Sequence, residues 1–165
     1  MWLLPVELLP HEGSLTKVLW QRPKEFISWR WTQKHQQWAQ AKTNDSASQA
    51  RWEALALTLA IWTWRDIVLK VGGPWRFLGD AKGVMQGAAK FKAKDPAINR
   101  LFMEIALIVV EAGHELHEEH LWSEDNFLAD QVSRLQEGAV LPEQLRGVHQ
   151  ARMEEPKWQI IPALM

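Results

Sequence analysis

Apolar positions along the chain follow two periods, and each period predicts a type of element. Short apolar or alternating stretches predict strands at Ser14–Trp20, Phe26–Trp31, Trp75–Leu78 and His114–Trp122. Longer stretches at helical spacing predict helices over Ala47–Leu69, from Ile98 to Ala112 and from Phe127 to Leu135. The polar residues 33–43 have no clean period and predict no regular element.

Residues typical of turns and helix ends bound these elements. The turn around Pro23 pairs the first two strands, and Ser46 with Gln49 forms a capping-box pattern before the long helix. Gly72, Gly73 and Pro74 end that helix. Asp95 followed by Pro96 predicts an N-cap and a first-turn proline, and Gly113 and Gly138 predict helix ends.

This order of elements predicts an α/β fold in which a mixed sheet is covered by helices. The domain is expected to span residues 1–138. From residue 139 to residue 165, prolines interrupt a segment without periodicity, so it is interpreted as a tail or linker whose Trp158 and Ile160 dock on a neighbour.

Composition narrows the chemistry. The 165 residues include no cysteine, which excludes disulfides, thiolate zinc sites and a cysteine nucleophile. The apolar runs are shorter than the roughly 20 residues that span a bilayer, and the first ten residues lack the basic start of a signal peptide. We therefore expect a soluble intracellular protein, cytoplasmic or nuclear, without membrane contact.

Charge is distributed unevenly although the net charge is only -1. Basic residues interleaved with tryptophans, among them Lys17, Arg22 and Arg30, occupy the segment from residue 17 to residue 42. Such a mixture can follow a nucleic-acid backbone and stack on bases. From Leu101 to Ser133 there is no Lys or Arg and the ionic side chains are acidic. Each run can also be an ordinary solvated face.

Three carboxylates stand where chemistry would use them. Glu53 is the only charged residue in the apolar helix stretch from Trp52 to Trp64, Asp80 follows a predicted buried strand, and Asp130 lies in the last helix. Each also has a structural interpretation: a carboxylate near a helix start, a turn aspartate, and a solvated helix charge. His114, His117 and His120 lack the spacing of a zinc motif.

Taken in order, these segments form a family pattern. The stretches ARWEALALTLAIW, WRFLGDAKGVMQG and DNFLADQVSRL resemble the ribonuclease H domain of retroelement reverse transcriptases, over roughly Ser14 to Leu135. The most specific part is similar to the N-x-x-A-D-x-x-S-R signature of LTR-type retrotransposons, and its residues here are Asn126, Ala129, Asp130, Ser133 and Arg134.

The resemblance implies a ribonuclease H-like mixed sheet flanked by helices and hydrolysis of the RNA strand of RNA/DNA hybrids. Glu53, Asp80 and Asp130 would be catalytic residues that hold two Mg²⁺ or Mn²⁺ ions about 4 Å apart. Basic residues would bind the hybrid backbone, and they are Lys17, Arg22, Arg30, Lys82, Lys90 and Lys92. The rest of a reverse transcriptase polyprotein would be a further partner.

One family feature is missing. The family places an aspartate on its first strand, whereas this chain has none before Asp45, and only Glu7 or Glu12 stands near the corresponding position. We therefore expect a truncated or degenerate first strand and impaired nuclease activity. Two alternatives stay open: a catalytically dead nucleic-acid-binding or tethering module, and a structural domain whose tryptophans, such as Trp2, Trp38 and Trp158, contact another chain.

Overall fold

The computed structural model describes residues 25–70, 74–122 and 126–161. In chain order its elements are β1 (Glu25–Phe26), α2 (Gln33–Ala39), η1 (Ser46–Ser48), α3 (Gln49–Thr63), α4 (Arg65–Lys70), β2 (Trp75–Gly79), α5 (Lys82–Ala89), α6 (Pro96–Glu111), β3 (Leu116–His120), α7 (Phe127–Ser133), η2 (Leu135–Glu137), η3 (Glu143–Leu145) and β4 (His149–Gln150). The protein therefore mixes helix and strand, which agrees with the predicted α/β class. None of the helices in these ranges combines the length and apolar character that crossing a membrane requires.

The strands form two parallel pairs in the described ranges. β2 pairs with β3 from Trp75↔Leu116 to Gly79↔His120, and β1 pairs with β4. Parallel neighbours need a crossover connection, and α5 and α6 supply it between β2 and β3. The carboxyl ends of β2 and β3 therefore lie at the same edge of the pair, and Asp80 follows β2 at that edge.

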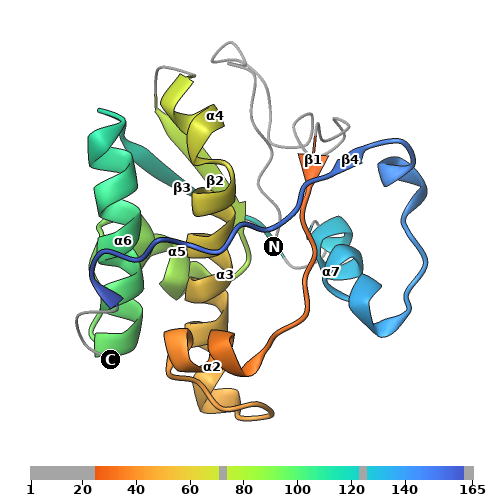
Figure 1. Cartoon of the computed structure of the whole chain (residues 1–165), viewed down its shortest axis with the longest axis horizontal. Coiled ribbons are helices and arrows are strands. Elements are labelled where there is room, and N and C mark those ends of the chain that lie inside the picture. The colour runs from red at the N-terminus through yellow and green to blue at the C-terminus, as the bar shows by residue number, and fades with distance from the viewer. Residues whose placement is uncertain (1–24, 71–73, 123–125, 162–165) are drawn as a thin grey trace.

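Helix α3 runs through the centre of the molecule (Figure 1). Every residue from Ala54 to Ile61 is buried, since α2, α5 and α6 all pack against this helix. A helix that is apolar on all sides is stable in water only when neighbours surround it completely. The arrangement of the other helices follows from that requirement.

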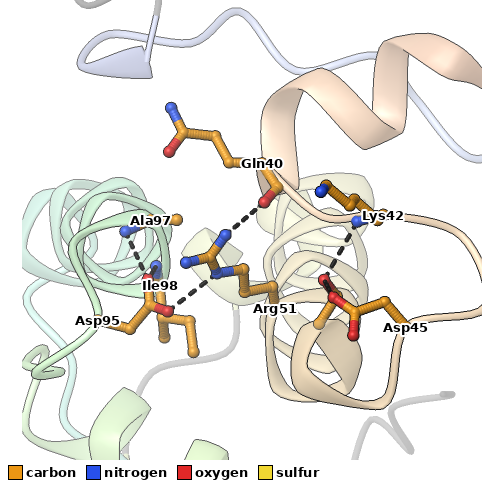
Figure 2. Close-up of polar contacts among 8 residues, drawn as sticks. Gln40, Lys42, Asp45, Arg51, Asp95, Ala97 and Ile98 are labelled. Carbon is orange, nitrogen blue, oxygen red and sulfur yellow. Dashed lines mark hydrogen bonds and ion pairs between the residues drawn. The ribbon is translucent and has the colours of Figure 1, made fainter.

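Arg51, in the first turn of α3, joins three helices (Figure 2). Its Nε donates to Oδ2 of Asp95 at 2.9 Å, and its Nη1 donates to the carbonyl of Gln40, which ends α2. Asp95 in turn caps α6 by accepting from the amides of Ala97 at 2.8 Å and Ile98 at 3.2 Å. Burial opposes ionisation of Asp95, but these hydrogen bonds and the guanidinium charge outweigh it and lower its pKa.

Glu104 connects α6 to the end of the chain. Its side chain is buried, and its carboxylate accepts the amides of Gln159 at 3.0 Å, Ile160 at 2.6 Å and Ile161 at 3.1 Å. A buried carboxylate requires such donors, because leaving its oxygens unpaired would cost several kcal/mol. The three consecutive amides therefore hold the C-terminal segment on α6.

The segment interpreted as a tail or linker thus packs against the same chain. It supplies β4, and Trp158 meets the ring of Trp38 with centroids 5.1 Å apart. In Figure 1 it crosses in front of α3 on its way to α6. The neighbour on which Trp158 and Ile160 dock is therefore their own domain.

Several predicted boundaries were wrong. The strand predicted over Phe26–Trp31 is regular only in β1, because its partner β4 is itself two residues long. Beyond it the chain is held by side chains, such as Ser28, whose Oγ donates to the Val132 carbonyl at 3.1 Å. The strand predicted at Ser14–Trp20 lies outside the described residues.

The helical predictions also need correction. The stretch Ala47–Leu69 is divided at Trp64 into α3 and α4. Asp45 caps the preceding η1 by accepting from the amide of Ala47, and Ser48 at the start of α3 forms no side-chain cap. The Gln49 side chain bonds to Glu53 within the helix and takes no part in a capping box with Ser46. The polar residues 33–43 contain helix α2, whose capping box is formed by Thr32 and His35. By contrast, the Asp95 cap and Pro96 start of α6 are confirmed.

Replacing Glu104 tests the contact between α6 and the C-terminal segment. Glu104→Gln leaves one acceptor oxygen and turns an amide NH₂ toward backbone donors, so we expect the free energy of unfolding to fall by about 2 kcal/mol. Urea unfolding measures this loss, and faster hydrogen exchange at Gln159, Ile160 and Ile161 would locate it. Glu137→Gln, at an exposed glutamate in η2, is the matched control. A loss no greater than in the control would contradict the assigned role.

Candidate functional site

Strand β2 places Asp80 at the carboxyl edge of the parallel pair. Asp80 is exposed, and its carbonyl accepts the amide of Lys82 at 2.9 Å as α5 begins. The strand pairing continues to this edge, because Leu121 donates its amide to the Gly79 carbonyl at 2.9 Å. Loops at the carboxyl ends of parallel strands are where α/β proteins commonly bind ligands.

Helix α3 places Glu53 near Asp80. The Glu53 side chain is partly buried, and its Oε1 accepts from Nε2 of Gln49 at 3.0 Å. Burial raises the pKa of Glu53, and the charge of Asp80 raises it further, while the Gln49 hydrogen bond partly opposes both. The charge of Asp80 therefore acts on Glu53, so these two carboxylates predicted from the sequence interact electrostatically.

Asp130 occupies a different environment. It is exposed on α7, and Nη2 of Arg134 lies 3.0 Å from its Oδ2, one helical turn away. Helix α7 packs through Leu128 and Val132 on a separate cluster that includes Phe26 and Leu145. The acid already has a cationic partner in this arrangement.

The described ranges contain no group of three His, Cys, Asp or Glu side chains that could hold a metal ion. The structure thus brings Glu53 and Asp80 together but does not add Asp130 to them in one ligand cluster. Glu7 and Glu12, the proposed substitutes for the first-strand aspartate, lie outside the described residues. Two carboxylates offer the hard oxygen ligands that Mg²⁺ and Mn²⁺ prefer.

The predicted nucleic-acid-binding residues divide into three groups. Lys82, Lys90 and Lys92 are exposed at the start and just after the end of α5. Arg30 is exposed as well, but its Nη2 donates to the Gln136 carbonyl at 2.6 Å, so it also joins the first segment to the region after α7. Lys17 and Arg22 lie outside the described residues.

An aromatic cluster that the sequence did not predict adjoins the candidate site. Trp31 is 42% exposed and lies against Trp52, with ring centroids 4.8 Å apart, and against His35 at 5.5 Å. Trp52 precedes Glu53 in α3. The alternation of Trp29 and Trp31 predicts a strand, whereas the structure packs the Trp31 ring against His35 of α2 and Trp52 of α3.

Comparison of the chain with protein-family models finds no match, and comparisons with curated proteins and with solved structures find none either. The functional interpretation therefore depends on the residues and geometry described above.

Glu53→Gln tests whether this carboxylate opposes folding. Because the folded state raises the pKa of Glu53, its contribution to stability is full at pH below its ordinary pKa and is lost as pH rises through the raised value. We expect the glutamine variant to be more stable than wild type at pH 7, and the gain to disappear below about pH 4. Urea unfolding across pH measures it, with Glu137→Gln, at an exposed glutamate in η2, as the control. A variant less stable than wild type at pH 7 would show that ionised Glu53 stabilises the fold.

Proposed function

We propose that the chain is a ribonuclease H-like domain of a retroelement reverse transcriptase, which binds RNA/DNA hybrids and cleaves the RNA strand weakly. The observation that carries the proposal is the interaction between Glu53 and Asp80, two acids 27 positions apart in the chain that the sequence pattern assigned to one site. Burial raises the pKa of Glu53, and the charge of Asp80 adds to that increase.

The arrangement of the elements supports the same proposal. Asp80 directly follows the first strand of the β2–α5–α6–β3 unit, and Glu53 comes from α3, which packs against α5 and α6 of that unit. In the segment that resembles the family signature, Ala129 is buried and Asp130 is exposed, which suits a helix whose acid projects outward.

The residues present fit a divalent cation of the Mg²⁺ class at Glu53 and Asp80. Such an ion would activate water and stabilise the leaving oxygen of the phosphodiester. Glu53 must lose its proton to ligate the ion, so its raised pKa makes binding weaker at acid pH. Lys82, two residues beyond Asp80, is placed to contact a phosphate of the bound strand.

The second candidate is a binding module that keeps the fold without hydrolysis. The ion pair between Asp130 and Arg134 favours it, because an acid already paired with arginine is a poorer ligand for a second cation. Both candidates would bind the RNA/DNA hybrid, so a cleavage assay is needed to separate them.

The first experiment measures cleavage of a labelled RNA/DNA hybrid in Mg²⁺ and in Mn²⁺. We expect slow cleavage by the wild-type chain and a further decrease of at least about tenfold in Asp80→Asn and Glu53→Gln, because each removes a metal ligand. Asp66→Asn changes an exposed acid on α4 and serves as the control. Hybrid binding without cleavage by any of these proteins would favour the binding module. Cleavage that survives both substitutions would contradict the assigned site.

A second experiment measures the salt dependence of hybrid binding. If Lys82, Lys90 and Lys92 contact phosphates, the triple alanine variant should lower the slope of log K against log salt by about one for each phosphate that is no longer neutralised. Lys70→Ala is the control. Lys70 is also exposed, but it precedes β2, whereas Lys82 follows the other end of that strand. An unchanged slope in the triple variant would exclude this surface from binding.

A further inference from the structure

The outer face of α6 is apolar. Met103, Leu107 and Val110 are 43%, 38% and 69% exposed, and Ala106 lies partly exposed between them. A helix on the surface of a globular domain normally presents polar residues to water. In Figure 1, α6 stands at one edge of the molecule. Exposed apolar side chains that line up on one helix are typical of an interaction surface.

Glu104 is the one charged residue between Arg100 and Glu111, and it does not make this face polar. Glu104 is turned into the core, where it accepts the amides of the C-terminal segment. Over these turns, helix α6 therefore buries its carboxylate while Met103, Leu107 and Val110 stay exposed. The spacing of four and then three residues among Met103, Leu107 and Val110 is that of a seam between two packed helices.

Charge is opposite at the two ends of this seam. Lys94 and Arg100 lie toward the start of α6, and Glu111 and Glu115 lie at and beyond its end. Within the described part of the chain, neither Arg100 nor Glu111 forms an ion pair. A second α6 that packed on this face in the parallel direction would place like charges together. An antiparallel second α6 would place opposite charges together.

We propose that the outer face of α6 is the contact surface for a second copy of this chain, with the two α6 helices antiparallel about a two-fold axis near Ala106 and Leu107. In that arrangement Met103 of each copy faces Val110 of the other. At 1.5 Å per residue, Arg100 of one copy lies within about 3 Å along the axis of the other copy's Glu111. Two such ion pairs flank the apolar seam, as an isologous interface requires.

The dimer is weak because the surface is small. A single seam of three turns buries less than the roughly 800 Å² per partner of a stable complex. We expect association in the micromolar range or weaker. High salt weakens it further, because the flanking ion pairs are solvent-exposed.

Sedimentation of the full chain over a concentration series tests the proposal. Leu107→Glu places a charge in the seam and should raise the dimer dissociation constant at least about tenfold, since it sets two carboxylates against each other. Val140→Glu alters an equally apolar residue that is 85% exposed in the loop before η3, and should leave association unchanged. Circular dichroism and thermal unfolding verify that each variant folds.

Charge reversal distinguishes this geometry from any other dimer. Arg100→Glu alone and Glu111→Arg alone should each weaken self-association, because both flanking pairs become like-charged. An equimolar mixture of the two variants should associate again, since a mixed dimer pairs two glutamates of one protein with two arginines of the other. A chain that is monomeric at all concentrations would overturn the proposal, and so would a dimer that Leu107→Glu does not weaken or a mixture that does not recover.

Discussion

Burial of the central two turns of α3 on all sides is the constraint on which the fold depends. Eight consecutive residues of this helix, Ala54–Ile61, are buried, so each side of the helix needs an apolar neighbour. Helices α2, α5 and α6 meet that need, and the C-terminal segment crosses in front of α3 (Figure 1). At the first turn Arg51 joins α2 and α6 to the same helix through hydrogen bonds.

Three carboxylates near this core show how environment assigns different roles to the same chemical group. Asp95 has a guanidinium and two amides, and its pKa is lowered. Glu104 has three amides of the C-terminal segment. Glu53 has Gln49 as a donor and faces the charge of Asp80, so its pKa is raised by burial and by that charge. The first two carboxylates hold elements together, whereas Glu53 is kept without full compensation, which is typical of groups retained for binding or catalysis.

The proposed cation site and the proposed dimer seam lie on different elements. Glu53 and Asp80 belong to α3 and to the end of β2, while the seam belongs to the outer face of α6. Because α6 packs on α3 through its inner face, both surfaces are supported by one core. Under the two proposals, the basic residues around α5 would face a phosphate backbone, and Glu111 at the end of α6 would face Arg100 of a second copy.

Local sequence determined the elements whose signals are strong and independent of neighbours. The Asp95–Pro96 start of α6, the strand at β2 and the α/β class could all be predicted, because capping, helical spacing and apolar runs act within a few residues. The family resemblance also assigns Glu53 and Asp80 to one site, and that assignment stays a prediction. Helix α2 could not be predicted, since its apolar contacts come from Trp38 packing on distant residues such as Trp158.

Only the tertiary structure decided which long-range partners each side chain has. It shortened β1 to the two residues that β4 can pair, turned the supposed tail into part of the domain, and paired Asp130 with Arg134. Glu104 appeared in the sequence as an acid on an apolar helix face, yet the amides that satisfy it are more than fifty residues away. Such contacts depend on which distant segments of the chain pack together. A hydrophobic period of 2 or 3.6 residues predicts the type of a local element but not its distant partners.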